Sequence, residues 1–274
     1  MLSVSFTTRS VDAGFAEALR WHLAPFRRSD PETQAFPVDL FVQQEDESPG
    51  PPRYSFFVAS TLRYRRSSLT ELLRFALWEL HALVPRRARD FLFLHAGSVV
   101  LDSGAMLLPA EMDAGKSSLT VALLQRGARY LSDELAAIDP VTAKAYPFPK
   151  RIWLDESGLR LFPDLAERLE DRTGLSAGLS QRYLRPEDLG SGIGDPTPVR
   201  WLIFPTADWD GPPRLTPIPR AAAVQRMAER GLNLYRYAER GLALLGRVAA
   251  VSDAYRLTGG TPAQRADLLL ERFS

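Results

Sequence analysis

A strand, a short loop and a helix follow one another within residues 106–127, and this order constrains the fold more than any other feature. The letters read "MLLPAEMDAGKSSLTVALLQRG": an apolar run leads into Gly115-Lys116-Ser117, and apolar residues then recur at helical spacing up to Gly127. A Gly-Lys-Ser tripeptide is typical of a phosphate-binding loop in this context, because the helix begins where the loop ends. The sequence therefore predicts an α/β protein with a phosphate site at this point.

The loop also predicts which ligand the site binds. Backbone N–H groups of the loop and the helix N-terminus form a positive cradle for a β-phosphate. Lys116 is placed to reach the β- and γ-phosphates, and the Ser117 hydroxyl to ligate Mg²⁺. We therefore expect ATP or GTP with Mg²⁺ as cofactors. The expected nucleotide-binding residues are Glu111, Met112, Asp113, Ala114, Gly115, Lys116, Ser117 and Ser118.

Two features of the loop depart from the usual pattern. Ala110 stands where the first glycine is expected, which is allowed if its φ is negative. Asp113 occupies a turn position, and aspartate tolerates a left-handed conformation better than most residues. A carboxylate about 6 Å from a phosphate costs about 3 kcal/mol per unit charge at an effective dielectric of 20. We therefore expect Asp113 to weaken phosphate binding without abolishing it.

Composition excludes several classes of protein. The chain has 274 residues, a formal net charge of +1 and no cysteine, so disulfides, thiolate zinc sites and cysteine nucleophiles are excluded. Its charge gives no field that would attract nucleic acid or anionic lipid. Neither a signal peptide nor an apolar run of membrane-spanning length is found, so we expect a soluble cytoplasmic protein. The oligomeric state stays open, and a homo-oligomer is one option.

Patterning along the chain predicts two domains: a small α+β domain over residues 1–90 and a larger α/β domain over residues 91–274. A hairpin around Asp102-Ser103-Gly104 precedes the loop. Residues 176–198 are expected to form a mobile loop. Further elements are expected as strands at 2–8, 37–44, 53–60, 128–132, 135–139, 199–205 and 254–259, and as helices at 13–26, 67–84, 219–232, 236–250 and after Thr261.

The larger domain resembles a known family in "LHAGSVVL", "LPAEMDAGKSSL", "RGARYLSDELAAID" and "YPFPK". These segments are similar to the C-terminal catalytic domain of the HPr kinase/phosphorylases, and more closely to the bacterial HPr-kinase-related kinases. Several of those occur beside peptide natural-product genes. The resemblance implies a P-loop kinase domain of the HPr kinase/phosphoenolpyruvate-carboxykinase-like type, a β-rich mixed sheet with flanking helices. The chain lacks the parent family's downstream glycine-rich signature, so HPr and the reverse phosphorylase reaction are not implied.

The resemblance also implies roles for three residues around Lys116. His95 precedes it by 21 positions and Asp133 follows it by 17, the order found in the family. There the aspartate takes the proton of an acceptor serine and the histidine tunes that aspartate. Glu134 stands at the position of a second acid, so Ser117 and Glu134 are the expected metal ligands. The implied substrate is a serine of a peptide or protein, which includes a ribosomal peptide precursor.

Other cations could stabilise a transferring phosphoryl group. The candidates are Lys150, Arg151, Arg182 and Arg185, and we rank Arg182 first as a catalytic residue. His22 and His81 lie on predicted helices and are interpreted as structural.

Two readings compete with a kinase. One is a nucleotide-dependent binding module that recognises a partner peptide or protein without chemistry. The other is a small-molecule carboxykinase-like enzyme, for which no metal-binding His/Lys/Asp set can be assembled. Asp133 favours a kinase, because a binding module does not need a base.

Overall fold

The computed structural model describes residues 2, 4, 6–26, 38–45, 53–111, 113–168, 181–237 and 239–274, with the backbone only at 38–45, 168, 181–182 and 239. The chain divides into two compact units. Met1–Arg89 and Glu167–Arg182 form the first, and Asp90–Ala166 and Tyr183–Ser274 form the second.

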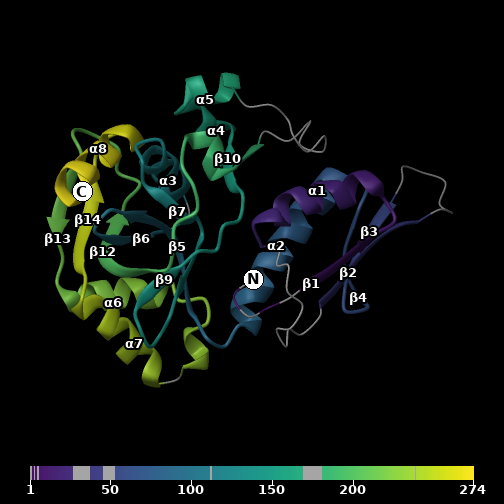
Figure 1. The fold of residues 1–274 in the computed structure, drawn as a ribbon, viewed down its shortest axis with the longest axis horizontal. Helices are drawn as coiled ribbons and strands as arrows, with labels where there is room; N and C mark the ends of the chain where they lie inside the picture. The colour runs from purple at the N-terminus through teal and green to yellow at the C-terminus, as the bar shows by residue number, and fades with distance from the viewer. Residues whose placement is uncertain are drawn as a thin grey trace. The chain divides into compact units, whose positions relative to one another are not determined.

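The first unit is a four-stranded sheet with two helices (Figure 1). The strands follow the order β1-β2-β3-β4, with β1 and β2 parallel and the other pairs antiparallel. Ser68 caps α2, since its side chain accepts a hydrogen bond from the Glu71 N–H. The elements are β1 (Phe6–Ser10), α1 (Ala13–Leu23), β2 (Val38–Glu45), β3 (Arg53–Val58), β4 (Thr61–Arg66) and α2 (Leu69–Arg87).

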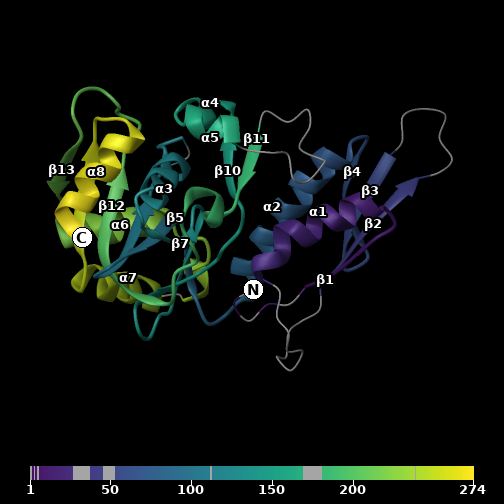
Figure 2. The same cartoon turned by 45° about the horizontal axis from the view of Figure 1, so that its top comes forward.

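The second unit is built on an eight-stranded mixed sheet (Figures 1 and 2). Its strands follow the order β13-β14-β12-β6-β5-β8-β9, and β7 pairs with β5 beside this path. A two-stranded sheet pairs β10 with β11. The strands from Leu92 onward are β5 (Leu92–Leu101), β6 (Gly104–Pro109), β7 (Arg129–Ser132), β8 (Leu135–Ile138), β9 (Lys144–Tyr146), β10 (Ile152–Asp155), β11 (Gln181–Leu184), β12 (Thr197–Pro205), β13 (Arg214–Pro217) and β14 (Asp253–Thr258).

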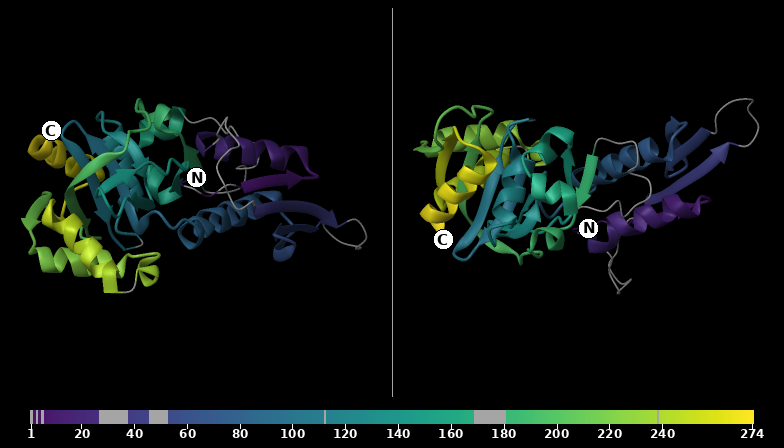
Figure 3. Two further views of the ribbon diagram at one scale, coloured as in Figure 1. Left: turned by 60° about the horizontal axis from the view of Figure 1, so that its bottom comes forward. Right: turned by 90° about the horizontal axis from the view of Figure 1, so that it is seen from above.

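Helices cover both faces of the large sheet, with α3 and α8 on one side and α6 and α7 on the other (Figures 1 and 3). The fold of this unit is therefore mixed α/β, with a large mixed sheet flanked by helices. The helices are α3 (Lys116–Leu124), α4 (Glu156–Arg160), α5 (Pro163–Arg168), α6 (Arg220–Glu229), α7 (Glu239–Ala250) and α8 (Pro262–Phe273). In the described part of the chain, no helix is both long and apolar enough to cross a membrane.

Side-chain alternation along β5 assigns its residues to the two faces of the sheet. Leu92, Leu94 and Ala96 belong to the core cluster that includes residues of α6 and α7. Gly97 faces the other way, because a Cβ there would lie 2.9 Å from the Thr120 hydroxyl on α3. Since strand residues alternate, His95 shares the α3 face with Gly97. The hydrophobic pattern of this strand thus places a histidine on the side of the predicted phosphate loop.

The expectation of a loop over residues 176–198 was wrong for part of its length. Gln181–Leu184 form β11, Pro186–Leu189 form a 3₁₀ turn, and β12 begins at Thr197. Arg185 stabilises the turn, since its guanidinium pairs with Asp188 at 2.8 Å. Residues 176–180 lie outside the described residues. No strand was predicted for β4, which is rich in arginine, or for β13, which ends in a proline.

Candidate functional site

Strand direction gathers the candidate residues at one edge of the large sheet. β12 is parallel to both β6 and β14, so the three carboxyl ends point the same way. β6 and β7 are both antiparallel to β5, so the carboxyl end of β7 also reaches this edge. Ligands of open α/β sheets bind beyond the carboxyl ends of the strands. The loops that follow β6, β7 and β12 are therefore expected to surround a common site.

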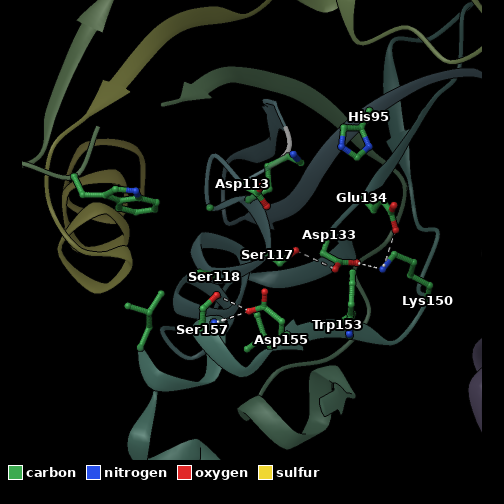
Figure 4. A pocket seen from close by; sticks show the side chains of 16 residues that line it. His95, Asp113, Ser117, Ser118, Asp133, Glu134, Lys150, Trp153, Asp155 and Ser157 are labelled. Carbon is green, nitrogen blue, oxygen red and sulfur yellow. Dashed lines mark hydrogen bonds and ion pairs between the residues drawn. The ribbon is translucent and has the colours of Figure 1, made fainter. Parts of the chain in front are cut away.

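A cavity of about 750 Å³ lies at this edge, within the second unit (Figure 4). This volume falls in the range of small-molecule sites. Its lining residues are His95, Asp113, Gly115, Lys116, Ser117, Ser118, Asp133, Glu134, Lys150, Trp153, Leu154, Asp155, Ser157, Gly158, Leu161 and Trp209.

The loop between β6 and α3 has the backbone of an anion cradle. Gly115 is left-handed, with φ of 80°, and it is the N-cap of α3 without a capping side chain. The first N–H groups of α3 are thus left for an anion. Asp113 is also left-handed, with φ of 61°, as expected for a turn position. Ala110 is not among the described residues with positive φ, so its backbone does not require a glycine.

The Lys116 ammonium folds back onto its own loop. Its Nζ donates to the backbone carbonyl of Ala110 at 3.0 Å and to that of Glu111. The side chain is only 7% exposed. Burial lowers the pKa of Lys116, and Arg230 lowers it further, against the opposing effect of Glu134, Asp113 and Asp133. The hydrogen-bond partners of the Lys116 ammonium are two neutral backbone carbonyls. A phosphate oxygen can replace them, because its charge-assisted hydrogen bond to the ammonium is stronger.

The two acids of the loop have different surroundings. The Glu111 carboxylate pairs with Arg230 at 2.7 Å, which offsets its charge at the rim of the loop. Asp113 is exposed and lines the cavity. The Asp113 carboxylate is therefore the main source of electrostatic repulsion against an anion in the loop. Arg230, which follows α6, also adds a positive charge near the loop that no sequence motif indicated.

Asp133 lies in the short bend that joins β7 and β8, opposite the middle of β5. It is 2% exposed, and both of its oxygens are engaged. Oδ1 accepts from the Tyr130 hydroxyl at 2.8 Å and from Lys150 Nζ at 2.9 Å. Oδ2 lies 3.4 Å from the Ser117 hydroxyl, which donates to it. Hydrogen bonds and ion pairs therefore connect the start of α3 to the end of β7 (Figure 4).

Lys150 joins Asp133 to the second acid. Its Nζ lies 3.2 Å from Glu134 Oε2, and the Glu134 side chain is 49% exposed. Burial alone would lower the pKa of Lys150, but the charges of Asp133 and Glu134 outweigh it and raise the pKa well above its ordinary value. Lys150 is thus a fixed cation held by two carboxylates.

His95 lines the same cavity from β5. Burial lowers its pKa, and Lys116 and Arg230 lower it further, while Glu134 and Asp133 act in the opposite direction. The imidazole is therefore held toward its neutral form near pH 7, and a neutral imidazole can accept a hydrogen bond or a proton.

Other predicted residues either lie outside the described residues or do not line the cavity. Met112 and the side chain of Arg182 lie outside the described residues. Arg151 is buried near Glu187 and Asp188, and Arg185 pairs with Asp188, and neither belongs to the residues that line the cavity. His22 is buried on α1 in the first unit, edge-on to Trp21. Of the four predicted cations, Lys150 lines the cavity.

The oxygen atoms near the loop suit a magnesium ion that is shared with a nucleotide. Within the described residues, no group of three or more His, Asp or Glu side chains forms a metal site. Mg²⁺ in nucleotide enzymes needs only one or two protein oxygens, because phosphates and water complete its shell. The Ser117 hydroxyl and the partly exposed Glu134 carboxylate, which both line the cavity, fit that pattern.

Sequence reasoning missed Tyr130, Trp209 and Arg230 at this site. Tyr130 is fully buried, and burial together with Asp133 raises its pKa well above the ordinary value, so it stays a neutral donor. Trp209 and Arg230 come from segments distant in sequence, and they carry no motif.

Compared with known proteins, the chain matches no protein-family model and has no significant similarity to a curated protein.

Proposed function

We propose that this protein is a kinase that transfers the γ-phosphoryl group of ATP or GTP to the hydroxyl of a serine in a peptide or protein. The observation that carries the proposal is the link between two parts of the cavity. Lys116 is held by exchangeable carbonyl bonds in a loop with a free helix N-terminus, and Ser117 connects that loop to Asp133. A phosphate-binding loop beside a carboxylate is what phosphoryl transfer to an alcohol requires.

In the proposed reaction, Lys116 moves from the Ala110 carbonyl to the β- and γ-phosphates. Ser117 and Glu134 are the residues that would hold Mg²⁺, which would neutralise charge on the phosphates. The serine oxygen forms a bond to the γ-phosphorus as the bond from that phosphorus to the β-bridging oxygen breaks. The serine proton passes to the Asp133 carboxylate, and the nucleoside diphosphate leaves. This role for Asp133, and that of His95 as its partner, rests on the family resemblance and on their shared cavity.

A second candidate is supported by the burial of Asp133. With both oxygens engaged and 2% of its surface exposed, this carboxylate is a poorly accessible base. That favours a nucleotide-dependent module that recognises a partner peptide or protein without transferring phosphate. We favour the kinase hypothesis, because Mg²⁺ and nucleotide would compete with Asp133 for the Ser117 hydroxyl. Asp133 Oδ2 would then be available to accept a proton.

The test is transfer of label from [γ-³²P]ATP and [γ-³²P]GTP with Mg²⁺ to peptides encoded beside the gene and to a cell extract. A labelled, acid-stable phosphoserine that disappears with Lys116→Ala supports the kinase. Nucleotide binding without any labelled acceptor supports the binding module. Absence of nucleotide binding at millimolar concentration rejects both.

A further inference from the structure

A tryptophan outside every motif lies directly against the phosphate loop. Trp209 lines the cavity, and a Cβ placed on Gly115 would lie 2.3 Å from its Cη2 atom. The ring edge thus occupies space that only a glycine at position 115 leaves open. Trp209 is still 38% exposed, so part of the ring is available to a ligand. A large aromatic surface beside a phosphate site is suited to a flat, aromatic group.

The support beneath Trp209 is rigid. The Arg265 guanidinium lies 4.0 Å from the ring centroid, a cation–π contact. Arg265 has no exposed surface, and it donates to the backbone carbonyls of Gly259, Thr206 and Asp208. The Gly259 N–H donates to the Asp208 carbonyl at 2.9 Å, and the Gly260 N–H donates to the Gly211 carbonyl at the same distance. The tryptophan is therefore preorganised, which reduces the entropy lost when a ligand stacks on it.

The order of strands in the sheet places Trp209 on one side of the loop and Asp133 on the other. In the path β14-β12-β6-β5, the Trp209 segment follows β12, on one side of β6. Asp133 follows β7, which pairs with β5 on the other side of β6. A triphosphate that lies across the loop with its γ-phosphate toward Asp133 must extend its nucleoside in the opposite direction. That direction leads toward Trp209.

We propose that Trp209, held by Arg265 against Gly115, stacks on the base of the bound nucleoside triphosphate. The inference rests on the proposed nucleotide site and adds its base-binding residue. Stacking uses the π-face that every base presents, so it binds without reading hydrogen-bonding groups.

The test compares MgATP with magnesium tripolyphosphate, which has the phosphates but no base, by calorimetry on the full chain. Wild type is expected to bind ATP more tightly than tripolyphosphate. Trp209→Ala should weaken ATP binding by about 5- to 150-fold and leave tripolyphosphate within about twofold. Trp209→Phe keeps an aromatic face and should stay within about fivefold of wild type. Trp78→Ala, which removes a tryptophan that is 55% exposed on α2 of the other unit, should change neither affinity.

Each other outcome has a distinct meaning. Equal losses for ATP and tripolyphosphate in Trp209→Ala would mean that Trp209 supports the loop rather than the base, and the inference would be overturned. Equal affinity of wild type for the two ligands would also overturn it, while leaving the phosphate site in place. Failure of wild type to bind either ligand would instead reject the proposed nucleotide site itself. A melting curve of Trp209→Ala close to that of wild type shows that the comparison concerns a folded protein.

Discussion

Two buried lysines line the cavity, Lys116 at the start of α3 and Lys150 between β9 and β10, and they differ in their partners. Lys116 is 7% exposed and Lys150 is 5% exposed. Burial outweighs the other effects at Lys116 and lowers its pKa, whereas two carboxylates raise the pKa of Lys150. The exposed fraction of these two lysines therefore does not decide the direction in which the pKa of each is shifted. The difference comes from the partner, which is a backbone dipole in one case and a charge in the other.

This contrast suggests a division of work between the two cations. Carbonyl bonds to Lys116 can be exchanged for bonds to phosphate at a net gain, since an ion pair replaces a dipole. Lys150 cannot exchange its partners in this way. If its ammonium moved away, the Asp133 and Glu134 carboxylates would be left in the cavity without their cation. We expect Lys116 to serve binding and Lys150 to serve the architecture of the acidic residues.

The largest effect is expected from Lys116→Ala. It removes the cation that would reach the β- and γ-phosphates, so calorimetry should detect no heat with ATP at millimolar concentration. The fold should survive, because the lost partners are loop carbonyls that water can reach once the side chain is gone. Lys144→Ala, which removes the one lysine outside the cavity, is the matched control and should bind like wild type. Unchanged binding in Lys116→Ala would contradict the phosphate-loop reading.

The next largest effect is expected on catalysis from Asp133→Asn. The amide keeps the shape and removes the basic oxygen, so labelled transfer should fall by about 10²–10⁴-fold while nucleotide binding persists. His95→Ala should reduce transfer less, since it would act through Asp133. Rates are measured with the acceptor identified by labelling. Transfer at the wild-type rate in Asp133→Asn would move the base to another residue of the cavity.

Lys150→Met sharpens the comparison through stability. It leaves Asp133 buried without its cation, and breaking a buried pair in this way costs about 3–5 kcal/mol of unfolding free energy. Urea denaturation measures the loss, which should greatly exceed that of Lys116→Ala. The double variant Asp133→Asn/Lys150→Met removes the stranded charge and should recover part of the loss. If the two single effects simply add, the pair is not coupled and the proposed role of Lys150 is wrong.

Much of the large sheet could be predicted because its signals are local. Alternating apolar residues and the Asp102-Ser103-Gly104 turn define the β5–β6 hairpin, and the Gly115 and Gly127 positions bound the helical run of α3. Thr261 caps α8 as its sequence suggests. Where the signal was weak, prediction failed, as in β4 with its three arginines and in β11, which has four residues and contains an arginine.

The site was only partly predictable, for a physical reason. Lys116, Ser117, Asp133 and His95 follow from a motif and from spacing, and the cavity brings them together. The salt bridges of Lys150 and Arg230, and the contact of Trp209 with Gly115, depend on which strands are neighbours in the sheet. A single sequence contains no local signal for that order.

A smaller effect is expected from Asp113, the exposed acid of the loop. Asp113→Gly removes a charge next to the proposed phosphates and relieves a left-handed residue, so ATP affinity should rise by up to about tenfold. Asp113→Asn removes the charge and keeps a side chain that tolerates this conformation, which separates the two causes. Calorimetry with ATP measures both. Weaker binding in both variants, with the loop still folded, would give Asp113 a positive role in the site.

The smallest effect concerns the pH dependence that His95 confers. Its pKa is lowered on folding, so below the ordinary value of 6.5 the unfolded chain takes up a proton before the folded chain does. The unfolding free energy should therefore fall as the pH drops from about 7 to about 5, by at most about 1.4 kcal/mol per pH unit from this residue. His95→Gln removes the titrating group, and it should lose less stability over that interval than wild type. Denaturant unfolding at pH 8, where both states of His95 are neutral, provides the reference difference between the two proteins. Parallel stability curves from pH 8 to about pH 5 would show that the imidazole is not held neutral beside Lys116 and Arg230.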